Sequence, residues 1–179
     1  MRNYFFKLGN ALSMRGETIL EKAAVAVYLH EKGFEPKAVW AFSRKISVVS
    51  FPIMPKKTGF LGLGKEVKVE VPTQAKIALT ETSLAIIGSN VQEVKEDKEI
   101  KRFISPHTQA MTSQLDLKEK KAIAFVVGSG DCSQFLEELS QQCTNRGAEV
   151  VATISFEPGS ADDQMELAVT KLMRELGMV

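Results

Sequence analysis

The sequence predicts an α/β fold built on a doubly wound parallel sheet, and two observations support this. The C-terminal half contains three short apolar runs of the kind that forms strands buried on both faces of a sheet. Segments with apolar residues at helical spacing follow these runs, and the connections are short. Such alternation is typical of right-handed βαβ units. The 179 residues fit one domain, spanning 1–179.

The three predicted strands are easily delimited. Leu84–Ile87 is continuously apolar and ends at Gly88, and Lys121–Val127 ends at Gly128 in the same way. The third predicted strand is Val150–Phe156. We expect all three to lie inside the sheet, because strands covered by helices on both faces are apolar throughout.

Three helices are expected beside these strands. One is predicted around Asp97–Phe103 and a second over Ser133–Arg146, which Gly147 ends. The third, Ala161–Leu176, carries an acidic first turn at Asp162, as the helix dipole favours.

The N-terminal half gives weaker patterns. Thr18–Lys32 has an apolar face at helical spacing and is predicted to be a helix that ends at Gly33. Ala38–Phe42, which contains the only tryptophan, Trp40, is predicted to be a strand. Tyr4–Leu8 is the candidate for the first strand.

An irregular connection or insertion is expected at about 43–80. Within 67–71 valines alternate with charged residues, which indicates an edge strand or a hairpin arm. Gly59–Lys65 has the outline of a P-loop, but Glu66 replaces its Ser or Thr, so we expect a turn or cover. Apolar residues in 51–63 either cover the core or join two copies in a homodimer.

Composition excludes several classes of function. The net charge of +1 gives no general attraction to nucleic acid or to a membrane surface. No apolar run approaches the ~20 residues that cross a bilayer, and Met1–Gly9 lacks the features of a secretory signal, so a cytoplasmic protein is expected. Cys132 and Cys143 fall in one predicted helix, too far apart to be bridged, and no Cys/His cluster suggests a metal.

In an open parallel sheet, ligands bind beyond the carboxyl ends of the strands, where the strand order reverses. Ser13–Thr18 (SMRGET) lies directly ahead of the predicted first helix and resembles the phosphate loop S-x-T-G-N-T of the flavodoxin family. Ser13, Gly16 and Thr18 match that pattern, whereas Arg15 and Glu17 do not. Simple capping of the helix by Ser13 or Thr18 is the alternative.

Two further loops carry the resemblance. Gly88–Gln92 is similar to the family's G-[S/T]-P-V loop beside the flavin ring, with Asn90 where proline is common. Gly128–Asp131 follows LKEKKAIAFVV, which closely resembles the family's LKGKKVALFVTGGG. The resemblance implies that backbone groups of this third loop, Gly128–Asp131, contact the polar edge of the flavin.

The resemblance implies a flavodoxin-like fold, with a five-stranded sheet of order 2-1-3-4-5 in three α/β/α layers. It implies FMN as cofactor, and electron transfer with an unidentified redox partner or flavin-dependent reductase activity. The flavin carries the redox chemistry, so no catalytic side chain and no metal are required. The implied FMN-binding residues are Ser13, Arg15, Gly16, Thr18, Ser89, Asn90, Val91, Gln92, Gly128, Ser129 and Gly130.

Two alternatives remain open at this point. One is a non-catalytic module with the same fold, used for binding or regulation after loss or alteration of the flavin site. Glu17, Asn90 and the absence of an obvious aromatic residue to stack on the flavin favour it. The other is a different phosphorylated ligand bound at the same helix N-terminus.

Overall fold

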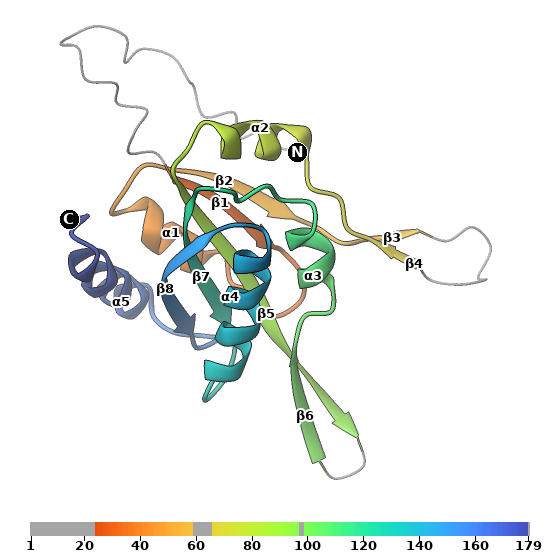
Figure 1. Ribbon diagram of the computed structural model, residues 1–179. Coiled ribbons are helices and arrows are strands. Elements are labelled where there is room, and N and C mark those ends of the chain that lie inside the picture. Colours follow the sequence, from red (N-terminus) through yellow and green to blue (C-terminus); the bar gives the residue numbers. More distant parts are fainter. Residues whose placement is uncertain (1–23, 59–65, 97–98, 179) are drawn as a thin grey trace, which may run out of the picture.

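The computed structural model of the chain describes residues 24–58, 66–96 and 99–178. Five parallel strands form the sheet in the order β2-β1-β5-β7-β8 (Figure 1). Ranked along the chain, this is the predicted order 2-1-3-4-5, and the predicted fold class is confirmed. The strands are β1 (Ala24–Leu29), β2 (Val48–Ile53), β5 (Leu84–Glu96), β7 (Lys121–Val127) and β8 (Glu149–Phe156).

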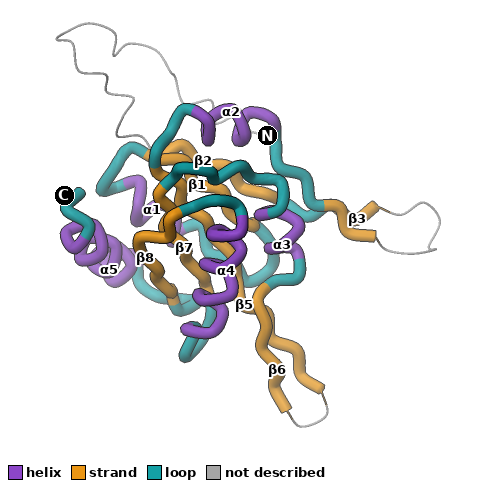
Figure 2. Tube along the Cα trace, in the orientation of Figure 1, coloured by secondary structure: helices purple, strands orange, loops and turns teal. Residues whose placement is uncertain are grey.

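Helices cover both faces of this sheet (Figure 2). One face is packed by α1 (Lys37–Ser43) and α5 (Asp162–Glu175). The other is packed by α2 (Thr73–Thr80), α3 (His107–Thr112) and α4 (Ser133–Asn145). Successive residues of each central strand join opposite clusters, since side chains alternate across a strand. The predicted three-layer arrangement is therefore confirmed.

The described residues also form two antiparallel hairpins, of which one extends the sheet and one is a separate two-stranded sheet. After Asn90, β5 runs on to Glu96 and pairs with β6 (Glu99–Ile104) in a ribbon that projects from the body (Figures 1 and 2). A shorter hairpin joins β3 (Lys56–Thr58) and β4 (Glu66–Lys68) within the connection 43–80. The hairpin arm predicted from the alternating valines is confirmed at β4.

Most other predictions in the C-terminal half are confirmed too. The expectation that 150–156 lies inside the sheet is wrong, because β8 is an edge strand in which only Phe156 is buried. The strands predicted at 84–87, 121–127 and 150–156 form β5, β7 and β8, and the helices predicted at 133–146 and 161–176 form α4 and α5. The helix predicted around Asp97–Phe103 is wrong, because residues 99–104 are strand β6. Their backbone groups pair with the extended β5.

Two predictions in the N-terminal half are also wrong. Residues 24–29 of the predicted helix Thr18–Lys32 are the buried strand β1, because AVAVYL is apolar on every side and its β-branched residues fit between two strands. The predicted strand Ala38–Phe42 is part of α1, which begins directly after Pro36, whose fixed φ suits a helix start. Tyr4–Leu8 and Gly59–Lys65 lie outside the described residues.

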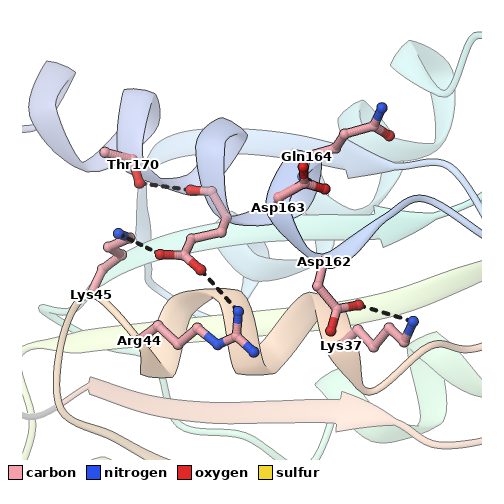
Figure 3. A network of polar contacts seen from close by, with 8 residues as sticks. Lys37, Arg44, Lys45, Asp162, Asp163, Gln164 and Thr170 are labelled. Carbon is pink, nitrogen blue, oxygen red and sulfur yellow. Dashed lines mark hydrogen bonds and ion pairs between the residues drawn. The ribbon is translucent and has the colours of Figure 1, made fainter.

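Ion pairs join α1 and its C-terminal turn to α5 (Figure 3). Lys37 Nζ lies 2.9 Å from Asp162 Oδ1. One carboxylate, that of Glu166, receives both Arg44 Nη1 at 2.9 Å and Lys45 Nζ at 2.8 Å. These ion pairs lie on the solvent side of the α1–α5 contact, where each contributes little to the free energy of unfolding. They help to orient the two helices, and the apolar residues beneath them supply most of the stability.

Candidate functional site

The strand order reverses between β1 and β5, and the loops at the carboxyl ends of β1, β5 and β7 meet at this edge of the sheet. These loops comprise His30–Pro36 after β1, Ser89–Gln92 within β5 and Gly128–Cys132 after β7. In an open parallel sheet, this is the edge where ligands bind.

Two amide side chains of β5 hold the loop that follows β1. Asn90 and Gln92 are two positions apart and therefore share a face of the strand. Asn90 Nδ2 donates to the Lys32 carbonyl oxygen at 3.2 Å, and Gln92 Nε2 donates to Glu31 Oε1 at 3.2 Å. Asn90 is fully buried, and its Oδ1 has no hydrogen-bond partner among the described residues.

Glu31 also binds the first residue of α3. Its Oε2 lies 2.8 Å from Nδ1 of His107, and the two side chains are only 12% and 24% exposed. The backbone N–H of His107 donates to Ser105 Oγ at 3.3 Å, which fixes the start of the helix. Both carboxylate oxygens of Glu31 are therefore occupied by polar groups of the protein.

Ser89 and Val91 lie on the opposite face of β5 from Asn90 and Gln92. The hydroxyls of Ser89 and Thr108 are 2.6 Å apart and both residues are buried, so this bond fastens β5 to α3. A Cβ added to Gly128 would lie 2.7 Å from the Val91 side chain. Only glycine allows the β7 loop to approach β5 this closely.

Arg102 of β6 clamps the loop between β7 and α4. Its Nη1 donates to the Asp131 carbonyl oxygen at 3.1 Å, and its Nη2 donates to the Ser129 carbonyl oxygen. The Nη2 atom also lies 3.5 Å from Cys132 Sγ, and the Nε atom lies 3.6 Å from a carboxylate oxygen of Glu93. One side chain of the hairpin thus organises the whole loop.

This clamp fixes the direction of the loop's N–H groups. In a trans peptide the C=O and the following N–H point in opposite directions. Because Arg102 binds the carbonyl of Ser129, the N–H of Gly130 faces away from Arg102, and no described residue accepts a hydrogen bond from it. Gly130 is exposed, with φ +63°, so this donor is open to a ligand.

The two titratable groups of the β7–α4 loop, Asp131 and Cys132, are not poised as a base or a nucleophile. Hydrogen bonds from the hydroxyl and backbone N–H of Ser133 hold the pKa of Asp131 below its ordinary value. Burial raises the pKa of the Cys132 thiol, although the charge of Arg102 opposes this. Cys132 is a packed, neutral thiol at neutral pH.

The loop after β1 has an unexpected composition for this fold. His30–Pro36 (HEKGFEP) contains no Ser or Thr but contains two carboxylates, Glu31 and Glu35. Glu35 Oε1 accepts a hydrogen bond from the N–H of Gly159 at 2.6 Å. A phosphate beside these carboxylates would be repelled.

The predicted site residues fall into two groups. Those of the second and third loops come together at the carboxyl edge: Ser89, Asn90, Val91, Gln92, Gly128, Ser129 and Gly130. Ser13, Arg15, Gly16 and Thr18 lie outside the described residues. Because β1 begins at Ala24, they precede the first strand of the sheet, and the loop directly ahead of α1 is His30–Pro36.

Three residues of this edge were not predicted from the sequence: Glu31, Arg102 and His107. Glu31 and Arg102 were assigned to the helices wrongly predicted at 18–32 and 97–103. Residues 99–104 (EIKRFI) do not alternate polar and apolar side chains, so the sequence carries no clear strand signal that would identify β6 and, with it, Arg102. His107 follows Pro106, a common place for a helix to begin.

Similarity to known proteins is found in structure and not in sequence. No protein-family model matches this chain, and no curated protein sequence matches it. Oxidised flavodoxin 1 from Bacillus cereus is 16% identical with a TM-score of 0.50, over 88% of this chain and 99% of that one. A Bacteroides eggerthii structure described as a flavoprotein is 9% identical with a TM-score of 0.57, over 84% of this chain and 98% of that one.

A flavo-diiron protein variant from Thermotoga maritima is 16% identical with a TM-score of 0.52, over 87% of this chain and 36% of that one. At these identities the similarity shows the fold alone: this chain is a flavodoxin-fold protein. Among the described residues, no group of three or more His, Cys, Asp or Glu is placed to hold a metal. Nor is any helix in those residues long and apolar enough to cross a membrane.

Among the described residues, one backbone group suits a flavin ring, whereas the loop ahead of α1 does not suit a phosphate. The exposed N–H of Gly130 is a donor suited to the oxygen-rich edge of an isoalloxazine ring. The phosphate does not fit the His30–Pro36 loop, which has carboxylates in place of hydroxyls. Any phosphate contact would have to come from elsewhere in the chain.

Proposed function

We propose that this flavodoxin-fold protein binds a flavin at the carboxyl edge of its sheet and acts in electron transfer or as a flavin-dependent reductase. The observation that carries the proposal is the loop 128–132, which Arg102 holds with the Gly130 N–H turned outward. A bound flavin would supply the electron chemistry, while the protein would position the ring and tune its potential.

In this proposal the described residues divide into two roles. The backbone of Gly128, Ser129 and Gly130 follows the polar edge of the ring, and Val91 and Gln92, both partly exposed, flank it. Ser89 and Asn90 are fully buried and hold α3 and the loop after β1 against β5. We propose FMN as the form of the cofactor, with the phosphate held by Ser13, Arg15, Gly16 and Thr18.

The first experiment is an absorbance spectrum of the purified protein between 300 and 550 nm, followed by titration of the apoprotein with FMN and with riboflavin. Tighter binding of FMN, lost in Gly16→Ala and Thr18→Ala, would support phosphate binding by the N-terminal segment. Equal binding of the two ligands would support a flavin held by its ring alone and contradict those phosphate contacts.

A second candidate is a flavin-free module for binding or regulation. It is favoured by Glu31 and Glu35, which occupy the loop after β1, and by the use of Glu31 in contacts within the protein. Absence of flavin bands and of binding in both titrations would select this candidate.

We further propose a homodimer as an assembly state, and sedimentation velocity at several concentrations tests it. A single monomeric species throughout would exclude the dimer. An unidentified redox partner is part of the flavin proposal only.

A further inference from the structure

The Glu31–His107 pair lies at the same edge of the sheet, and its contacts do not involve a flavin. We propose that His107 is an acid–base residue, which accepts a proton at Nε2 from an N–H or O–H group of a ligand seated at the carboxyl edge. Glu31 acts as its positioning residue.

The first step of the argument is the state of the imidazole ring. A carboxylate oxygen 2.8 Å from Nδ1 requires a proton on that nitrogen, since ionised Glu31 can only accept. A neutral His107 then has its lone pair on Nε2. Nε2 forms no hydrogen bond with any described residue and is not among the buried unpaired atoms, and the side chain is 24% exposed, so this nitrogen is open to a ligand.

The second step is the rigidity of the pair. Glu31 is held on its other oxygen by Gln92 Nε2 at 3.2 Å, and Gln92 is fixed by its place in β5. His107 is held through its backbone N–H by Ser105 Oγ. Pro106 restricts the chain just before it. Both partners are therefore fixed from outside the pair, as a positioned acid–base group requires.

The third step is the chemistry. The proton moves from the ligand's N–H or O–H to Nε2, the bonding electron pair stays on the ligand atom, and the imidazolium carries the positive charge. The carboxylate of Glu31 stabilises that charge at Nδ1.

The test uses the full-length apoprotein labelled with ¹⁵N-histidine. The chain has only two histidines, His30 and His107, so a His30→Gln variant assigns the spectrum. Long-range ¹H–¹⁵N correlation should show neutral His107 mainly with its proton on Nδ1. In Glu31→Ala this preference should be lost, because free imidazole side chains favour the proton on Nε2. His107 with its proton on Nε2 in the wild-type protein would overturn the proposal.

A second measurement needs no variant. Diethyl pyrocarbonate acylates an unprotonated imidazole nitrogen and releases ethyl carbonate. We expect folded wild-type protein to be acylated at His107 Nε2 without loss of structure by circular dichroism. Protection of His107 until the protein unfolds would show that the Glu31–His107 contact is purely structural. Both readouts are made without flavin, so failure of the flavin proposal leaves them unaffected.

Discussion

The guanidinium carbon of Arg102 lies 5.3 Å from the centre of the Phe135 ring. Arg102 belongs to the β5–β6 hairpin and Phe135 to the first turn of α4, so the contact joins the projecting ribbon to the body of the protein. The cation–π attraction adds to the bonds that Arg102 makes to the β7–α4 loop.

Replacing Arg102 should therefore weaken the fold as well as the loop. We expect Arg102→Met to lower the free energy of unfolding by about 1–3 kcal/mol, because two charge-assisted hydrogen bonds are lost while the apolar stem is kept. Urea denaturation measures this. Arg102→Lys is the matched control and should recover only part of the loss, since one ammonium cannot reproduce the forked contact. Unchanged stability of Arg102→Met would mean that the clamp contributes nothing.

Gly88 is required by close packing inside the sheet. A Cβ there would lie 2.1 Å from Cζ of the fully buried Phe125. We expect Gly88→Ala to cost about 3 kcal/mol or more, since neither the strand nor the ring can move freely. Gly159→Ala is the control: it has φ +78° with nothing within 4 Å, and should cost only about 1–2 kcal/mol of backbone strain. Equal losses in thermal or urea unfolding would contradict the packing argument.

Cys143 should make stability depend on alkaline pH. Burial raises the pKa of its thiol from 9.0 to about 12. Between these values the unfolded chain has lost the proton and the folded chain has kept it, so stability is complete below pH 9 and falls as the pH rises. The slope approaches about 1.4 kcal/mol per pH unit.

Comparison with Cys143→Ala isolates this effect from the other titrating groups. The stability advantage of the wild-type protein should shrink by about 2 kcal/mol between pH 8 and pH ~10.5, measured by urea denaturation. If the difference in free energy of unfolding between wild type and Cys143→Ala stays constant over this pH range, the thiol has the same pKa in the folded and the unfolded chain.

Glu166 should make a small contribution to the free energy of unfolding, and this contribution should depend on salt concentration and on pH. Hydrogen bonds from Lys45 and Arg44 hold its pKa below the ordinary value of 4.5. Its contribution is present above that ordinary value and is lost as the pH falls through the lower folded-state value. Glu166→Gln should lower the melting temperature at neutral pH and low salt, and the difference should vanish at ~1 M salt.

The control for this prediction is Glu138→Gln on α4. Glu138 is exposed and forms no ion pair with any described residue. The melting temperature of the Glu138→Gln variant should stay close to that of the wild type at every salt concentration. A salt-independent loss in Glu166→Gln would assign the effect to packing.

The sheet was predictable where strand signals are unambiguous. Leu84–Ile87 and Ala122–Val127 are continuously apolar and are followed by glycine. Each is too short for a buried helix, so the strand assignment follows from length and composition. Ala24–Leu29 has the same character, but it follows Thr18–Lys22, and the combined stretch mimics a helical face. The pairing of this segment with β2 on one side and β5 on the other, a tertiary effect, stabilises the strand β1 over a helix.

The functional edge was predictable only in part, for the same reason. Gly128 and Asn90 were found because glycine-rich strand ends mark that edge from local sequence alone. Glu31 and His107 are far apart in the sequence, and only the pairing of β1 with β5 brings them within 2.8 Å of each other. Local patterns carry no information about such a contact.

Strand β5 belongs to two structures at once: residues 84–90 lie against β7 in the sheet, while 91–96 pair only with β6. A two-stranded ribbon has little stability of its own. The amide hydrogens of this single strand should therefore exchange with solvent on two timescales, the first half through global unfolding and the second through local fraying. The boundary at Asn90 and Val91, beside Glu31 and Gly128, places the candidate site at the junction between well-protected sheet backbone and readily exchanging ribbon backbone.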